Sequence, residues 1–330
     1  MPAIQETRTI NALLTTTLAN FREQLIDNIF DDYPLLSWLN GKLGRALRGT
    51  TRENDSVKRT ISGGESIVEH LLFGQNSTVD SYAGYELLDV TPQEGMTQAR
   101  YNWKQYSGSV TISGLEERSN EGEAKMIDLL RAKTMQTEMS LRDRLSRDGY
   151  ADGTGNAGKN LTGLAALVSD SSTVGGINPS TNTWWKANVT SSIGSFAANG
   201  VDKMRTAFNN VTFGNDKPDI IFTTQDVFEF YEKTLQPILR ISSNKAADAG
   251  FENLLYKNVP IIFDRDCTSG SMYMLNSRYV SYVVHGGADF KTGEFIKPEN
   301  QDAKTANILL QANTTTNNRR KLALLSGFTA

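Results

Sequence analysis

The sequence predicts an α+β fold that combines an N-terminal arm, a long β-hairpin, one long helix and a mixed α/β region. Apolar and polar residues alternate before residue 113, which is the pattern of strands. Apolar residues then recur every three or four positions, as in an amphipathic helix, and short strands and helices follow one another from residue 161 to 297. At 330 residues the chain is long enough for about two compact domains.

Composition excludes several classes of protein. With 34 basic and 37 acidic residues the formal net charge is −3, so the chain lacks the basic excess of a nucleic-acid reader. Cys267 is the only cysteine, which excludes an intrachain disulfide framework and a multi-cysteine zinc site. The start lacks the basic-then-apolar layout of a secretion signal, and no apolar run is long enough for a membrane span. We therefore expect a soluble protein with no membrane partner.

The first 54 residues predict an arm and not a domain. Apolar residues spaced by three or four from Leu14 to Ile29 predict a helix, and Pro34 and three glycines interrupt the stretch that follows. Four cations recur every three or four residues and would share one side of a local helix: Lys42, Arg45, Arg48 and Arg52. This basic arm face is either a solvated surface or a contact for an acidic partner or a nucleic acid.

Residues 55–113 predict a long β-hairpin with a wide tip. Ala99, Tyr101 and Trp103 alternate with polar residues, and the alternation resumes with a shifted phase from Tyr106, which predicts a bent or bulged strand. An isolated two-stranded hairpin is marginal in water, so its apolar side chains need another surface. They are candidates for contacts between subunits: Ile67, Leu71, Phe73, Leu87, Tyr101 and Trp103.

A helix of about 28 residues is predicted for 121–148. Asn120 and Glu123 stand in the capping-box relation, and Gly149 supplies a C-terminal stop. One face of this helix carries Met126, Leu130, Thr134, Thr137, Leu141 and Leu145. The helix is longer than the average globular helix of about 11 to 12 residues, so we expect it to act as a spine of the fold.

The glycine-rich stretch GTGNAGKN resembles a phosphate-binding loop in every position but the last. Asn160 stands where such a loop has the Ser or Thr that coordinates magnesium, and the stretch follows a helix and not a buried strand. A calcium loop starting at Asp148 fails because Tyr150 and Lys159 occupy ligand positions. We therefore expect a turn with several residues of positive φ.

Residues 161–297 predict a mixed α/β region. Residues 201–211 form an amphipathic helix, and a buried strand before Thr223 leads into a second helix that begins near Asp226 and ends near Pro237. Three further strands are predicted in NVPIIFDRDC, SMYMLN and YVSYVVHG. The tail reads as two apolar strands joined by a polar turn.

The candidate chemical groups do not assemble into a reactive site. His70 and His285 lack metal-ligand spacing and are expected to be ordinary strand residues, and Cys267 is expected to be a structural thiol, although it could in principle pair with His285. We expect no catalytic residues, no cofactor, no metal and no small-molecule substrate.

Two paired features allow a functional and a structural interpretation. Asp264 and Asp266 would point the same way on an extended strand, as in an acidic pair or a metal site, but a strand-end turn explains them more simply. Trp184 and Trp185 are either packing or interface residues or a binding platform, and packing is the simpler interpretation.

Several stretches, and the order of the elements, resemble the major capsid proteins of tailed bacteriophages, whose shell fold is shared with encapsulins. These stretches are YSGSVTISGLEERSNEG, YADGTGNAGKNLTGLAALV, TVGGIN followed by TWWKAN, GFENLLYKNVPIIFDRDC, and MYMLNSRYVSYVVH. The resemblance covers essentially the whole chain.

The resemblance implies a major-capsid-type fold in four parts. These parts are an N-terminal arm (1–54), an extended hairpin loop that lies across a neighbouring subunit (55–113), a peripheral domain with the spine helix (114–158 and 298–330), and an axial α/β domain (159–297).

The resemblance also implies the function and the partners. Copies would form pentamers and hexamers of an icosahedral shell around double-stranded DNA, which the near-neutral chain would contact weakly and without sequence preference. A separate scaffolding protein and a portal would take part in assembly in the cytoplasm of the bacterial host, and the product would be the capsid of a virion. Two alternatives stay open: an encapsulin-like nanocompartment shell, and a tail or decoration protein.

Overall fold

The computed structural model describes residues 33–41, 57–119, 129–235 and 254–330. The described residues fall into two compact units. The first contains 106–119, 129–144 and 287–310, and the second contains the remainder. The predicted arm helix, the basic arm face (Lys42, Arg45, Arg48 and Arg52) and the predicted capping box (Asn120 and Glu123) lie outside the described residues.

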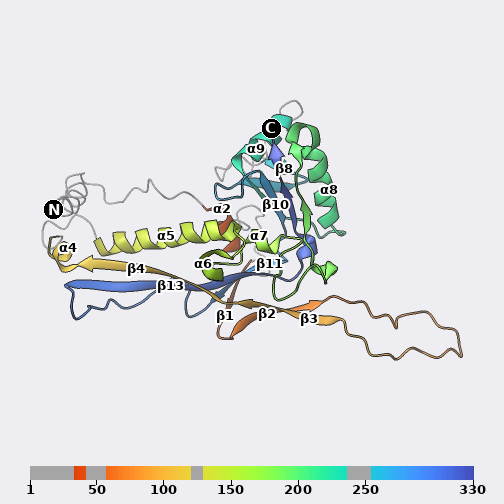
Figure 1. The fold of residues 1–330 in the computed structure, drawn as a ribbon, viewed down its shortest axis with the longest axis horizontal. Helices are drawn as coiled ribbons and strands as arrows, with labels where there is room; N and C mark the ends of the chain where they lie inside the picture. The colour runs from red at the N-terminus through yellow and green to blue at the C-terminus, as the bar shows by residue number, and fades with distance from the viewer. Residues whose placement is uncertain (1–32, 42–56, 120–128, 236–253) are drawn as a thin grey trace. The chain divides into compact units, whose positions relative to one another are not determined.

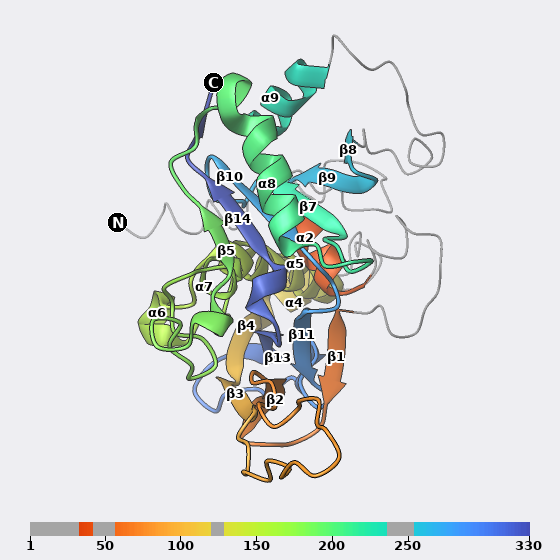
Figure 2. The same ribbon diagram turned by 90° about the vertical axis from the view of Figure 1, so that its right-hand side faces the viewer.

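The second unit is organised around a six-stranded sheet, whose strands appear in Figure 2. In spatial order these strands are β5 (Asn188–Thr190), β14 (Ala323–Ser326), β10 (Ser271–Leu275), β7 (Ile220–Thr223), β9 (Val259–Phe263) and β8 (Leu254–Tyr256). β7 pairs with β9 in parallel and with β10 in antiparallel orientation. All four residues of β7 are buried, which explains why its sequence is a continuous apolar run ending in threonine. The expected strands of this region are confirmed, and so are the two helices over their described residues; the predicted helix end near Pro237 lies outside the described residues.

Two helices cover one face of this sheet: α8 (Val201–Val211) and α9 (Gln225–Leu235). Ile221 of β7 belongs to the core that these helices share. The next residue, Phe222, points to the other face because side chains alternate along a strand, and there Trp38 of α2 (Pro34–Leu39) meets it edge-on at 5.8 Å. Both faces of the sheet are therefore covered.

A second group of strands in this unit supports the hairpin. β1 (Lys58–Ile61) pairs in parallel with β11 (Val280–His285), and β11 pairs in antiparallel orientation with residues 312–316 of β13 (Ala303–Thr316). The hairpin itself consists of β2 (Ser66–Leu72) and β3 (Met96–Asn102), which pair only with each other among the described strands. Figure 1 shows this two-stranded ribbon and the loop at its end.

The strand that follows β3 is interrupted as the sequence predicts. β3 ends at Asn102, and β4 (Lys104–Ser113) begins after Trp103. Ala99 and Tyr101 are buried before the interruption, and Val110 and Ile112 are buried after it. The predicted shift of phase is confirmed, because the chain leaves its pairing with β2 at this point and β4 pairs with β13.

The first unit contains most of β4, the first half of β13, the two-residue strand β12 (Lys291–Thr292), α4 (Gly114–Ser119), and α5 (Leu129–Tyr150) up to Arg144. Leu141 of α5 packs with Val110 of β4 and Ile308 of β13. Gly108 permits this contact, since a Cβ there would lie 2.5 Å from the Thr137 methyl carbon. The predicted long helix is thus confirmed for its described part, and it ends one residue after Gly149.

The two C-terminal strands are confirmed, but they lie in different sheets. β13 pairs with β11 and β12, whereas β14 is inserted between β5 and β10. The predicted polar turn between them contains a fully buried Arg319, whose guanidinium donates to the backbone carbonyls of four residues: Ala166, Leu167, Ser169 and Ser172. This arginine fixes the chain between the sheets.

The remaining described elements are short. They are α6 (Gly155–Gly158), α7 (Leu164–Leu167), β6 (Gly194–Ser195), β15 (Phe328–Thr329), 3-10 turns at Thr183–Trp185 and Arg319–Lys321 (η4), and a π-helical turn at Phe196–Gly200. Among the described helices, none combines the length and apolar character that a membrane crossing requires.

Candidate assembly surfaces

The base of the hairpin, residues 66–71 and 97–102, is anchored to its own chain. The Tyr101 hydroxyl donates to the Thr316 carbonyl at 2.8 Å and accepts the Thr316 amide at 3.3 Å. Burial raises the pKa of this hydroxyl, so it stays protonated and able to donate. Glu69 adds an ion pair with Arg59 at 2.5 Å and accepts the Thr315 hydroxyl at 3.1 Å.

Three of the six predicted contact residues therefore need correction. Ile67, Leu71 and Tyr101 are 1%, 6% and 4% exposed within a single chain, so their side chains cannot cover a neighbour. The reason is that the base of the ribbon packs against residues far away in the sequence, which alternation alone does not reveal. The remaining three stay predictions, and only Phe73 and Leu87 are substantially exposed, at 41% and 100%.

The hairpin tip, defined here as residues 72–96, differs from the base. It holds nine of the seventeen large hydrophobic side chains that are exposed in the described part of the chain. These nine are Leu72, Phe73, Val79, Tyr82, Tyr85, Leu87, Leu88, Val90 and Met96. Such a concentration on one loop is unusual for a surface in contact only with water.

The hairpin tip is also purely acidic. Asp80, Glu86, Asp89 and Glu94 are its only charged residues, and it contains no Lys, Arg or His. Local hydrogen bonds shape it: the Asp89 carboxylate accepts the Thr91 hydroxyl and amide, which holds the pKa of Asp89 below its usual value. A surface that covers the tip must therefore offer both apolar area and positive charge.

One aromatic contact joins the edge of the tip to the body of the second unit. Phe73 stacks on Trp184 with a centroid separation of 5.2 Å and an interplanar angle of 18°. Trp185 is 1% exposed, and its indole nitrogen donates to the Val174 carbonyl. The tryptophan pair is thus engaged in packing, as the simpler interpretation of the sequence expected.

The half-buried Trp103 stands where β3 gives way to β4. Its indole nitrogen donates to the Gly64 carbonyl at 2.9 Å, and its ring meets His285 edge-on at 5.7 Å. The Gly63 amide donates to Nε2 of His285 at 3.1 Å. Gly63 and Gly64 both have positive φ, and together these contacts fix the path of the chain into the hairpin. His70 and His285 are strand residues in β2 and β11, as predicted.

The glycine-rich loop after α5 has the predicted geometry. Gly153, Asn156, Ala157 and Gly158 all have φ between 52° and 79°. Asn160, the residue that departs from the phosphate-binding pattern, is 7% exposed and donates to the Asp148 carboxylate at 3.1 Å. Its amide closes the loop after a helix, whereas a phosphate-binding loop follows a strand.

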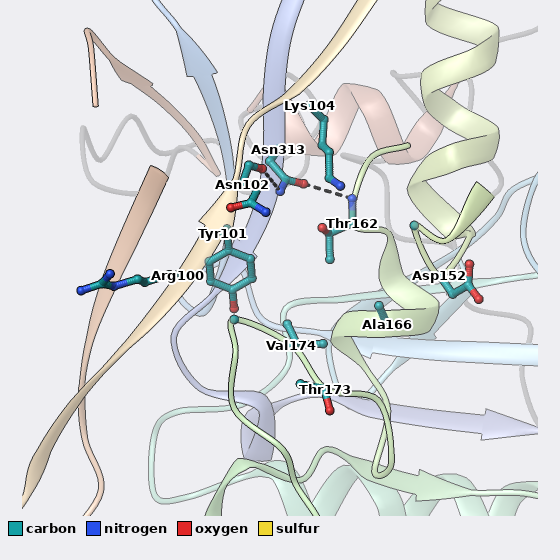
Figure 3. A pocket seen from close by; sticks show the side chains of 12 residues that line it. Arg100, Tyr101, Asn102, Lys104, Asp152, Thr162, Ala166, Thr173, Val174 and Asn313 are labelled. Atoms are coloured by element: carbon teal, nitrogen blue, oxygen red, sulfur yellow. Dashed lines mark hydrogen bonds between the residues drawn. The ribbon is translucent and has the colours of Figure 1, made fainter. Parts of the chain in front are cut away.

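A small cavity lies beside this loop, and Figure 3 shows its lining. Its volume is about 180 Å³. The Arg100 and Asp152 side chains point away from it in Figure 3. Asn313 accepts the Thr162 amide at 3.0 Å and donates to the Asn102 carbonyl at 2.7 Å. The polar groups of this cavity therefore bind the chain itself and do not converge on a ligand position.

The aspartate pair after β9 is structural. Asp264 is 3% exposed and accepts the Leu35 amide, the Tyr150 hydroxyl and the Asp266 amide at 3.0 to 3.2 Å. Burial raises the pKa of Asp264 in spite of these hydrogen bonds. The neighbouring Cys267 is 6% exposed, and burial raises its pKa too, which leaves it protonated and unreactive at neutral pH. No group of three potential metal ligands occurs within the described ranges.

Comparison with known proteins shows which solved structures share this fold. No protein-family model matches the chain, and no curated protein matches it in sequence. Solved structures do match over nearly the full length. The capsid of cyanophage A-1(L) superposes with a TM-score of 0.64 at 14% identity, covering 95% of this chain and 98% of that one. The capsid of an empty GTA particle gives 0.62 at 10% identity, covering 94% and 95%.

An encapsulin matches to a similar degree. The SrpI encapsulin of Synechococcus elongatus PCC 7942 gives a TM-score of 0.58 at 11% identity, covering 96% of this chain and 95% of that one. The chain therefore has the α+β fold found in tailed-phage capsids and in this encapsulin. The predicted fold class is confirmed.

Proposed function

We propose that this chain is a major capsid protein, with a structural and not a catalytic role. Copies associate as pentamers and hexamers into an icosahedral shell that encloses double-stranded viral DNA. The shared fold supports a shell-forming role, and the hairpin tip is the observation that carries it. An apolar ribbon end of this size becomes stable in water when neighbouring copies cover it.

The magnitudes are sufficient for assembly. Fully burying one large hydrophobic side chain contributes about 1.5 to 3 kcal/mol. Covering only four of the nine exposed side chains of the tip would contribute about 6 to 12 kcal/mol per copy before the cost of association. Because each copy in a closed shell makes several such contacts, individually modest contacts give a stable particle.

The other partners follow from this role. The net charge of −3 supports weak, nonspecific contact with the enclosed DNA. We further propose a separate scaffolding protein and a portal, with assembly in the cytoplasm of the bacterial host and the finished protein in the virion capsid. An encapsulin-like shell is the second candidate, supported by the match to the SrpI encapsulin. Nucleic acid in purified particles indicates a viral capsid, and an enclosed protein indicates an encapsulin.

The test is to shorten the hairpin tip. Phe73 N donates to Gly95 O at 2.9 Å, so the two arms of the ribbon lie side by side where the tip begins. Replacing residues 75–94 with an Asn-Gly turn should close the ribbon without strain. We expect the purified wild-type protein to form closed particles in negative-stain micrographs, and the shortened chain to remain as folded subunits. Closed particles formed by the shortened chain, or a wild type that stays monomeric at high concentration, would contradict the proposal.

A matched variant separates tip length from apolar contact. The triple substitution Tyr85→Ser, Leu87→Ser and Leu88→Ser keeps the length and the charge of the tip but removes three of its nine exposed apolar groups. We expect it to raise the protein concentration required for assembly by at least about tenfold, since the lost burial exceeds 1.4 kcal/mol. Assembly at the wild-type concentration would show that the apolar groups of the tip do not carry the contact.

A further inference from the structure

Three turns meet at one end of the six-stranded sheet. They are 213–217 before β7, 276–279 after β10, and η4 (319–321) before β14. The strand register brings them together, because Leu275 at the end of β10 pairs with Ile220 at the start of β7, and Met274 pairs with Ala323 at the start of β14. Segments at least 40 residues apart in sequence thus form one surface.

A hydrogen-bonded network locks the three turns to one another. Asp216 accepts the Tyr279 hydroxyl, the Asn276 amide at 2.8 Å and the Lys321 ammonium at 3.2 Å. Burial alone would raise the pKa of Asp216, but these hydrogen bonds outweigh it and hold the pKa below its usual value. One carboxylate therefore joins all three turns and stays ionised.

This network supports a basic and aromatic surface, which we call the three-turn patch: Phe213, Lys217, Arg278, Arg320 and Lys321. Phe213 is 48% exposed, with the Lys321 ammonium 3.7 Å and the Arg320 guanidinium 6.0 Å from its ring centroid. Lys217, Arg278 and Arg320 are exposed. Two carboxylates, Asp216 in the first turn and Asp219 just after it, are less exposed and bind Tyr279 and Ser277. The patch presents positive charge around an aromatic ring in a preorganised geometry.

A surface of opposite charge lies elsewhere on the same unit. α9 exposes Asp226 and Glu229 and half-exposes Glu232, which are spaced by three residues and share one side of the helix. No ion pair joins these carboxylates to a cation within the described residues. Phe263, which is 50% exposed, packs edge-on against Phe228 of α9 at 5.3 Å. The α9 face thus combines negative charge with an exposed aromatic ring, as the patch combines positive charge with one.

The two surfaces occupy opposite ends of the sheet. The patch lies where β7 and β14 begin, while α9 starts two residues after β7 ends at Thr223. In Figures 1 and 2, α9 lies near the C-terminus, which follows the far end of β14. Because the sheet separates them, the cations of the patch cannot pair with the carboxylates of the α9 face within one copy.

We propose that the three-turn patch of one copy binds the α9 face of a second copy. The contact joins two different surfaces, so it is heterologous, and repeated head-to-tail contacts of this kind form a ring when the rotation between successive copies closes. This inference rests on the proposed shell function and specifies the contact that forms its pentamers and hexamers. Packaged DNA and the acidic hairpin tip of another copy are the competing anionic partners. The exposed Phe213 favours a protein partner over DNA, and the four-substitution chain described below separates the α9 face from the tip.

Charge reversal tests the pairing on the full chain. The patch variant carries Arg278→Glu and Arg320→Glu, and the α9 variant carries Glu229→Arg and Glu232→Arg. We expect each variant to raise the concentration required for assembly by at least about tenfold in analytical ultracentrifugation. The chain with all four substitutions should assemble within about threefold of the wild-type concentration, because the reversed charges again attract. A control with Lys186→Glu and Lys291→Glu, two exposed cations outside both surfaces, should assemble as the wild type does.

The outcomes separate this inference from the proposed function. A patch variant that assembles normally, or a four-substitution chain that does not recover, overturns the pairing. Normal particles that have lost nucleic acid assign the patch to DNA and also overturn it. In each of these cases the shell function stands as long as the wild type forms particles and the shortened-tip chain does not. Near-wild-type circular dichroism and unfolding midpoints for each variant ensure that lost assembly is not lost folding.

Discussion

The base and the tip of the hairpin belong to one ribbon, yet they bury their apolar side chains in different ways. At the base, Ile67 and Tyr101 are covered by the chain itself, and the Tyr101 hydroxyl pairs with the backbone of Thr316. At the tip, Tyr85 and Leu87 are fully exposed. The apolar residue types are alike, so they do not distinguish the two regions. What distinguishes them is whether a surface of the same chain lies within reach.

This difference separates folding from assembly. Contacts at the base contribute to the stability of a single copy, because they exist before any neighbour is present. Apolar groups at the tip contribute only when another surface covers them, so their contribution depends on protein concentration. Substitutions at the base should therefore change unfolding, and substitutions at the tip should change association.

The largest effect is expected from truncating the same residue type in the two regions. Tyr101→Ala removes a buried ring and leaves the Thr316 amide and carbonyl without their partner, so it should lower the free energy of unfolding by about 3 to 5 kcal/mol. Tyr85→Ala should change it by less than about 0.5 kcal/mol. Urea unfolding of the unassembled full-length chain measures both. Equal losses would mean that the tip is also packed within one copy.

The second prediction extends the comparison to carboxylates. Because burial raises the folded-state pKa of Asp264 above its usual value, its stabilising contribution is complete below that usual value and is lost as the pH rises through the raised pKa. Asp264→Asn removes this dependence and disrupts the acceptor of the Leu35 amide and the Tyr150 hydroxyl. We expect it to lower the free energy of unfolding by about 1 to 3 kcal/mol at low pH and by less at neutral pH.

The matched carboxylate in the tip should behave differently. The pKa of Asp89 is lowered by Thr91, so any contribution has the opposite pH dependence and disappears as the pH falls. Asp89 is fully exposed, and Asp89→Asn should leave the urea midpoint unchanged between pH 4 and 8. A constant effect of Asp264→Asn over this range would contradict the assignment of a raised pKa to Asp264.

The third prediction concerns the junction of the hairpin with the body. Trp103→Phe keeps an aromatic ring beside His285 but removes the hydrogen bond to the Gly64 carbonyl, and should lower stability by about 1 kcal/mol. Hydrogen exchange should accelerate at the amides of Gly63 and neighbouring residues more than in the tip. Trp184→Phe, which preserves a ring stacked on Phe73, is the matched control and should have the smaller effect. Unchanged exchange at Gly63 would show that Trp103 does not hold the junction.

The sequence predicted the features that depend on neighbouring residues. The shift of phase around Trp103 is a local property of the strand. The glycine content of the loop after α5 likewise predicts its positive φ angles. The burial of Ile67 and Tyr101 was missed because Tyr101 bonds a residue 215 positions away. Arg319 was missed for a related reason: a charged residue in a polar turn is normally exposed, and only the fold supplies its four carbonyl partners.

The candidate surfaces also divide into those formed by neighbouring residues and those formed by residues far apart in the sequence. The sequence predicted a ribbon whose apolar side chains need another surface, but not the division of that ribbon into a buried base and an exposed tip. The three-turn patch could not be predicted, because its cations lie on three separate turns that only the pairing of β7, β10 and β14 brings together. Surfaces made by one segment are visible in a sequence, and those made by sheet register are not.

The smallest expected effect is a gain in stability in the glycine-rich loop after α5. Contacts within the chain hold this loop, as they hold the base of the hairpin. Ala157 has φ 55° and ψ 41°, a left-handed conformation that costs an L-residue about 1 to 2 kcal/mol. The loop keeps this conformation because Asn160 is bonded to Asp148 and because Gly153 lies so close to the Leu161 carbonyl that a Cβ there would be 2.9 Å from it. In the described tip, by contrast, no residue has positive φ. Ala157→Gly removes this strain, and it loses no buried contact because Ala157 is exposed. The greater entropy of glycine in the unfolded chain offsets part of the gain. We therefore expect a net stabilisation of about 0.5 to 1 kcal/mol in urea unfolding. Ala132→Gly, in the interior of α5, is the control with the opposite outcome and should lose about 1 kcal/mol. If both substitutions destabilise the chain equally, the loop does not hold Ala157 in the left-handed region.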